Sequence, residues 1–140
     1  MIGLIDGDVV AYKAAYLADG GSDEDIRDLV VAIVGTWLDE CGADSGVVCL
    51  GSKPTFRHRI FPDYKAKRGE KPERLPECIG ALEENFVCLR MPDLEADDAL
   101  GILGTGKYKD RSVIISIDKD LLQIPGNHYN PDKKRHSVVT

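Results

Sequence analysis

The chain has 140 residues, of which 43% are hydrophobic, and it carries 24 acidic against 18 basic residues, for a net charge of −6. This composition is typical of one folded domain and excludes a disordered chain. No apolar run approaches the roughly 18–20 residues of a membrane span, and the N-terminus lacks a basic segment followed by a long apolar stretch. We therefore expect a soluble protein inside the cell. The four cysteines show no C-x-x-C pairing, which favours reduced structural thiols over zinc ligands or disulfides.

The periodicity of apolar residues predicts strands that alternate with helices along the chain. In chain order we expect a strand at residues 2–5, helices at 8–17 and 23–42, a strand at 47–50, an extended segment at 56–61, a helix at 73–85, a strand at 86–89, a helix at 93–104, a strand at 113–117 and short terminal strands at 127–129 and 137–139. Asp8 and Asp23 are candidate N-caps of the first two helices. Such alternation predicts right-handed βαβ units, and hence an α/β fold with a mostly parallel central sheet and helices on both of its faces.

One stretch of the chain, residues 57–74, carries seven basic against three acidic side chains. Within it, residues 62–72 are polar and contain Gly69 between two prolines, which predicts a long basic loop or arch. The charge alone fits an ordinary solvated loop equally well. Beside an acidic site, however, a basic loop favours a substrate that bears phosphate groups.

Three short acidic clusters carry most of the functional information. They consist of Asp6 with Asp8, of Glu95 with Asp97 and Asp98, and of Asp118 with Asp120. Each lies where a predicted strand ends or a predicted helix begins, and the carboxyl ends of parallel strands meet at one edge of a sheet. Carboxylates gathered there repel one another unless divalent cations hold them, and a donor set without histidine suits Mg²⁺ or Mn²⁺ better than Zn²⁺. The clusters therefore predict a metal site, although each taken alone also fits a helix cap.

The order of these motifs resembles that of the N-terminal catalytic part of the 5′→3′ exonuclease and flap endonuclease family, and most of all its bacteriophage members. The matching segments are Leu4-Ile5-Asp6-Gly7-Asp8, Phe56-Arg57, Asp63-Tyr64-Lys65-Ala66-Lys67-Arg68, Leu94-Glu95-Ala96-Asp97-Asp98 and Ile114-Ile115-Ser116-Ile117-Asp118-Lys119-Asp120. They span about residues 1–130 and keep the family's order and approximate spacing. The resemblance implies a single PIN-like, resolvase-like domain over residues 1–140 that hydrolyses phosphodiesters with Mg²⁺ or Mn²⁺.

The resemblance also implies roles for individual side chains. The metal ligands would be Asp6, Glu95, Asp97, Asp98, Asp118 and Asp120. The residues that contact the substrate would be Arg57, Tyr64, Lys65, Lys67 and Arg68. Of these, Tyr64, Lys65 and Arg68 match the base of the family's helical arch. Asp6 and Asp118 would act in catalysis together with Lys65, which would polarise the scissile phosphate, and Arg68, which would contact it in a bidentate manner. The implied substrate is DNA with 5′ ends, flaps or branches, and also RNA in hybrids, in the cytoplasm of a bacterium or a phage-infected host.

Two features depart from the family pattern. Ser52 stands where the family usually has an aspartate after the second core strand. The sequence ends at Thr140, before the family's further acidic Gly-Asp-x-x-Asp segment and its helix–hairpin–helix element. One well-held metal ion is therefore the expectation, and a second one depends on ligands from elsewhere.

Two other interpretations stay open. The chain fits a module that binds nucleic acid and metal but cleaves only when a second chain or a C-terminal region supplies the missing elements. A phosphatase could use Asp6 and Asp8 as nucleophile and acid. That pattern requires serine or threonine at the position of Val10 and a basic residue before the last acids, and neither requirement fits well.

Overall fold

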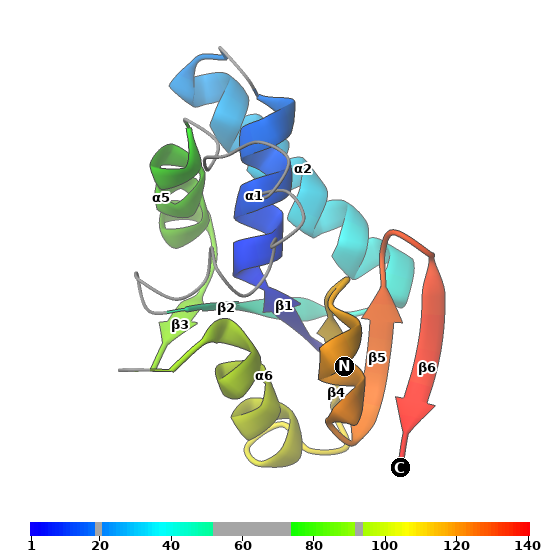
Figure 1. The fold of residues 1–140 in the computed structure, drawn as a ribbon. Coiled ribbons are helices and arrows are strands. Elements are labelled where there is room, and N and C mark those ends of the chain that lie inside the picture. Colours follow the sequence, from blue (N-terminus) through cyan, green and yellow to red (C-terminus); the bar gives the residue numbers. More distant parts are fainter. Residues whose placement is uncertain (19–20, 52–73, 92–93) are drawn as a thin grey trace.

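The computed structural model describes residues 1–18, 21–51, 74–91 and 94–140. Within these ranges the elements are, in chain order, β1 (Ile2–Asp6), α1 (Gly7–Leu17), α2 (Asp23–Cys41), β2 (Ser45–Leu50), α5 (Leu75–Asn85), β3 (Cys88–Arg90), α6 (Ala96–Thr105), β4 (Ser112–Ile115), the 3₁₀ helix η1 (Lys119–Gln123), β5 (Gly126–Asn130) and β6 (Arg135–Val139) (Figure 1). The predicted extended segment at 56–61 and the predicted loop at 62–72 lie outside the described residues, as do Ser52, Arg57, Tyr64, Lys65, Lys67 and Arg68.

The strands of the described part form one six-stranded sheet in the order β3-β2-β1-β4-β5-β6. β1 lies inside the sheet, where it pairs in parallel with β2 and with β4. β3 and β5 extend the parallel arrangement on either side, and only β6 runs antiparallel to its neighbour. The prediction of a mostly parallel sheet is confirmed, and the carboxyl ends of β1, β2 and β4 lie at one edge.

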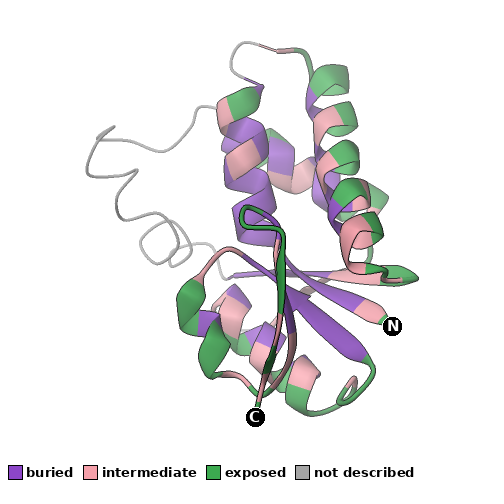
Figure 2. Cartoon of the chain, turned by 90° about the vertical axis from the view of Figure 1, so that its right-hand side faces the viewer, coloured by how far each residue is buried: buried purple, intermediate pink, exposed green. Residues whose placement is uncertain are grey.

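Helices cover both faces of this sheet, as predicted. Figure 1 shows α1, α2 and α5 above the sheet and α6 below it. The upper core joins apolar residues of α1, α2 and α5 to Ile5 and Ile115, and the lower core joins Leu100 of α6 and Leu121 of η1 to Leu4 and Ile114. α1 is buried along most of its length because it packs against α2, α5 and β2 (Figure 2). None of the helices in the described ranges combines the length and hydrophobicity needed to cross a bilayer.

Two helices begin at caps that differ from the prediction. The N-cap of α1 is Asp6 and not Asp8, because β1 runs directly into α1 and its last residue takes the capping position. The N-cap of α2 is Ser22 and not Asp23. Its hydroxyl accepts a hydrogen bond from the Asp25 N–H at 3.1 Å, and the Asp25 carboxylate accepts one from the Ser22 N–H at 3.2 Å. The reciprocal pair satisfies two N–H groups that would otherwise lack partners at the helix start.

The four cysteines are free thiols, and Cys49 and Cys78 are buried. Burial raises the pKa of the Cys49 thiol to about 12 and that of Cys78 to about 11. Both side chains therefore stay protonated near neutral pH and act as small apolar groups in the core, which agrees with the prediction of reduced structural thiols.

Candidate metal centre at the carboxyl edge of the sheet

The junction of β1 and α1 buries two carboxylates at the carboxyl edge. Asp6 is 0% exposed and Asp8 is 1% exposed. Asp6 Oδ1 accepts a hydrogen bond from the Val9 N–H at 3.5 Å, and both oxygens of Asp8 lie 3.3 Å from the N–H of Gly51, just after β2. Buried carboxylates require such donors because desolvation penalises their charge.

A serine just after the neighbouring strand β4 joins the first acidic cluster to the last. The Ser116 hydroxyl, just after β4, donates to Asp6 Oδ2 at 2.9 Å and accepts from the Asp118 N–H at 3.1 Å. Asp118 in turn caps η1, where its Oδ1 accepts from the Asp120 N–H at 2.9 Å. Ser116 is not among the site residues that the sequence predicts. The sequence feature that could have identified Ser116 is its position directly after a buried strand and two residues before Asp118.

The middle cluster occupies the first turn of α6. Glu95 is the N-cap, and its N–H donates to the Asp98 carboxylate at 3.2 Å. The positive end of the helix dipole favours carboxylates at this position. The helix therefore begins later than predicted, at Ala96, because Glu95 takes the capping position.

A groove of about 530 Å³ between α6 and η1 is lined by residues of both the second and the third cluster. Its acidic lining residues are Asp97, Asp98 and Asp120, and its apolar ones include Ile102, Leu121 and Ile124. The predicted ligands thus form two sets in the described part, one around this groove and one in which Ser116 connects Asp6 to Asp118. Among residues 1–18, 21–51, 74–91 and 94–140, no three side chains of His, Cys, Asp or Glu form a ready-made metal cage. The complete ligand set remains a prediction.

Negative charge accumulates at this edge of the sheet. Burial is the largest cause of the raised pKa of Cys49, and the charges of Asp6, Cys88 and Asp8 raise that pKa further. Carboxylate oxygens without nitrogen or sulfur donors suit hard cations. A carboxylate offers about four lone-pair sites, so capping a helix and coordinating a cation are compatible for one side chain.

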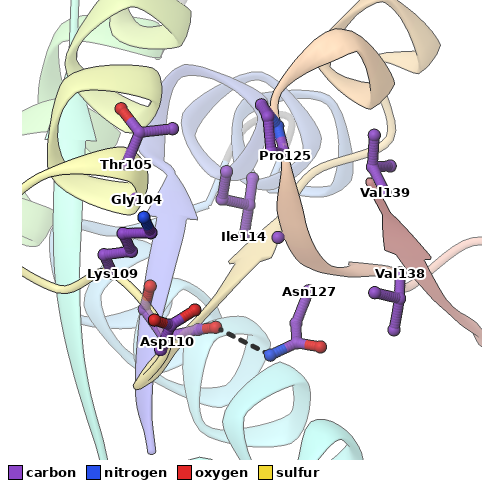
Figure 3. Close-up of a pocket in the computed structure, with 11 residues that line it drawn as sticks. Gly104, Thr105, Lys109, Asp110, Ile114, Pro125, Asn127, Val138 and Val139 are labelled. Atoms are coloured by element: carbon purple, nitrogen blue, oxygen red, sulfur yellow. Dashed lines mark hydrogen bonds between the residues drawn. The ribbon is translucent and has the colours of Figure 1, made fainter.

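A cavity of about 350 Å³ lies elsewhere, at the amino ends of β4 and β5 (Figure 3). Its charged lining residues are Lys109 and Asp110, and Asn127 Nδ2 donates to the Ser112 carbonyl beside it at 3.4 Å. None of the predicted site residues within the described part lines this cavity. Ligands of open parallel sheets bind at the carboxyl ends of the strands, so we place the candidate site in the acidic edge and not here.

The fold and its edge carboxylates define an α/β domain of the resolvase-like class. The chain belongs to the 5′-3′ exonuclease family, because residues 1–137 match the family model described as the 5′-3′ exonuclease, N-terminal resolvase-like domain. The family that the motif order predicted is confirmed.

Named relatives support this assignment. The 5′-3′ exonuclease of Buchnera aphidicola is 34% identical over 102 residues, which cover 67% of this chain and 36% of that protein. A thermostable DNA polymerase I of Thermus thermophilus is 31% identical over 134 residues, which cover 86% of this chain and 16% of that protein. The flap endonuclease Xni of a Shewanella strain is 33% identical over 88 residues, which cover 59% of this chain and 33% of that protein. The matched regions thus span between 16% and 36% of the length of these relatives.

Solved structures with the same fold come from bacteriophage T5. A flap endonuclease in complex with DNA and metal ions superposes with a TM-score of 0.63 at 17% identity, over 98% of this chain and 57% of that chain. A 5′-exonuclease with bound zinc superposes with a TM-score of 0.61 at 17% identity, again over 98% and 57%. At such low identity the likeness establishes the fold alone.

Proposed function

We propose that this chain is a divalent-metal-dependent 5′-nuclease domain that hydrolyses phosphodiesters of nucleic acid at 5′ ends, flaps or branches. One observation carries the proposal. Carboxylates from three distant parts of the sequence form two sets: Asp97, Asp98 and Asp120 line one groove, and Ser116 connects Asp6 to the backbone of Asp118. Membership of the 5′-3′ exonuclease family supports the choice of reaction.

The donor set fits Mg²⁺ or Mn²⁺. Asp97, Asp98 and Asp120 would hold a cation in the groove, with Glu95 beside them, and Asp6 and Asp118 would complete the site at the strand ends. When bound, such cations supply positive charge beside the scissile phosphate and lower the pKa of water. The T5 structures of the same fold hold DNA and metal ions in one case and zinc in another, which supports a divalent cation and a DNA substrate as the general classes.

The residues of the chain itself would position and stabilise the reacting groups. The Ser116 hydroxyl orients the Asp6 carboxylate, and the Asp120 N–H orients the Asp118 carboxylate, each through a donated hydrogen bond. Lys65 and Arg68, which lie outside the described residues, would stabilise the negative charge that develops on the phosphate oxygens. Arg57, Tyr64 and Lys67 would bind the strand on its way to the edge.

Cleavage of a 5′-flap DNA by the purified 140-residue chain, with Mg²⁺ and with Mn²⁺, tests the proposal. Asp118→Asn keeps the shape of the η1 cap but removes its charge, and we expect it to lower the cleavage rate by about 100-fold or more. The matched control is Asp110→Asn at the opposite edge, where the backbone φ of 65° suits asparagine. Equal rates for both variants, with unchanged melting temperatures, would refute the site assignment.

A second candidate is a module that binds metal and nucleic acid but does not cleave alone. The absence of a ready-made cage of three ligands in the described part favours a site that other residues complete. The same assay separates the two candidates, because the module would bind the flap substrate without turnover under either cation.

A further inference from the structure

The carboxyl edge of the sheet carries a second, smaller cavity of opposite charge. This basic cavity has a volume of about 90 Å³ and lies between η1 and the hairpin of β5 and β6. Its charged lining residues are the bases Lys119, Lys133 and Arg135 and the single acid Asp118, and its polar ones include Ser116, Asn130 and Ser137. The volume is below the roughly 300–1,000 Å³ of sites for drug-sized ligands, so it suits one small group and not a whole nucleoside.

The three cations around the basic cavity differ from their neighbours in their pairing. Lys119, Lys133 and Arg135 form no ion pair with any residue of the described ranges. In contrast, Lys134 of the same hairpin contacts Glu40 at 2.9 Å, and Lys13 contacts Asp132 at 2.7 Å. Of the two consecutive lysines in the hairpin, Lys134 is therefore neutralised by Glu40, whereas Lys133 lies beside the cavity without an ion pair in the described part.

The hairpin geometry adds neutral donors to this charge. Asn130 pairs with Arg135, and His128 pairs with Ser137, so these residues share one face of the sheet with η1. Asn130 Oδ1 accepts from the N–H groups of Asp132 at 3.0 Å and Lys133 at 3.1 Å. The amide Nδ2 of Asn130 and the hydroxyl of Ser137, both of which line the cavity, can supplement the cations as donors for an anion.

We propose that the basic cavity binds a phosphate group of the nucleic-acid strand, adjacent to the phosphate that is cleaved. Asp118 lines the basic cavity and caps η1, while Asp120 of the same helix lines the acidic groove. A strand that crosses η1 would meet the cations of the hairpin next to the carboxylates. Contacts of this kind fix the register of a strand without reading its sequence. The inference rests on the proposed nuclease function for the source of the phosphate, but not for the binding itself.

Titration of the ¹⁵N-labelled chain with inorganic phosphate, in EDTA and without divalent cations, tests the cavity directly. We expect saturable shifts of the Lys119, Asn130 and Ser137 amide signals. Lys133→Gln and Arg135→Gln should each raise the apparent Kd at least about tenfold, because each removes a charge-assisted hydrogen bond. Lys134→Gln, which removes the same charge from the same hairpin, should change it less than about twofold, since its partner is Glu40.

Oligonucleotides with a 5′-phosphate and with a 5′-hydroxyl then identify the source of the phosphate. Shifts that require the 5′-phosphate assign the cavity to a strand end, and equal shifts assign it to an internal phosphodiester. The proposal would be overturned if phosphate caused no saturable shifts, or if Lys134→Gln raised the apparent Kd as much as Lys133→Gln and Arg135→Gln do. The cleavage assay and the phosphate titration test the two proposals separately. Cleavage without phosphate shifts refutes only the proposal for the basic cavity, and phosphate shifts without cleavage refute only the proposed nuclease function.

Discussion

Ser116 connects the carboxylate of Asp6 to the backbone of Asp118, a residue far away in the sequence. Its hydroxyl donates to buried Asp6 and accepts from the Asp118 N–H. We expect Ser116→Ala to lower the free energy of unfolding by about 1–3 kcal/mol in EDTA, because a buried acceptor loses a donor. Urea denaturation measures this change, and Ser45→Ala at an exposed position of β2 is the control. A loss no larger than that of the control would show that the hydroxyl does not support Asp6.

The buried phenol of Tyr129 should make the free energy of unfolding depend on pH under alkaline conditions. Its side chain is 3% exposed and donates to Glu40 at 2.8 Å. Burial and the Glu40 carboxylate raise the pKa of Tyr129 to about 12. A raised pKa favours the neutral phenol in the folded state, so its contribution to stability is complete below the ordinary pKa of about 10 and is lost as the pH rises through about 12.

Urea denaturation of the wild type and of Tyr129→Phe on either side of that ordinary pKa tests this dependence. The difference in the free energy of unfolding between the two proteins should be constant below about pH 10 and should shrink above it. A difference that stays the same across this range would contradict the raised pKa.

At the scale of elements, the close docking of α1 on β2 sets the position of the first acidic cluster. A Cβ added at Gly7 would lie 2.5 Å from Val48 Cγ1 and 2.9 Å from the Cys49 carbonyl oxygen. The backbone oxygen cannot move without disturbing the pairing of β1 with β2. We therefore expect Gly7→Ala to cost about 1–3 kcal/mol of stability or more, measured by thermal or urea unfolding.

Gly35 in α2 provides the matched control, because a Cβ added there would have no atom within 4 Å. Gly35→Ala should stabilise the chain by about 0.5–1 kcal/mol through its helix propensity. Destabilisation of similar size at both positions would contradict the account of α1 docking.

Most elements follow from the sequence, because their periodicity is local. The apolar spacing from Ile26 to Leu38 predicts α2, and the apolar run at residues 47–50 predicts β2. The identity of the capping residues cannot be predicted from the sequence in the same way. Either acid in Asp6-Gly7-Asp8 is suited to capping, and Asp6 takes the position because its pairing with Cys49 extends β1 to that residue. That choice depends on tertiary contacts that local propensity does not contain.

At the scale of the whole molecule, the sequence predicts that the acids meet at one edge but not which of them become neighbours. The placement of β1 between β2 and β4 brings Asp6 beside Ser116 and Asp8 beside Gly51. Strand order is a long-range property, which explains why Ser116 was missed. The basic cavity was missed for the same reason, since the hairpin and η1 become its walls only in the folded chain.

The central claim is that the acidic edge holds divalent cations, and Mn²⁺ bound in crystals of the chain tests it most directly. Anomalous diffraction should locate at least one Mn²⁺ at about 2.0–2.6 Å from carboxylate oxygens of Asp97, Asp98 or Asp120, or of Asp6 and Asp118. Asp118→Asn should lower the occupancy there. Mn²⁺ found only at other surface carboxylates, with none at these five aspartates, would contradict the account.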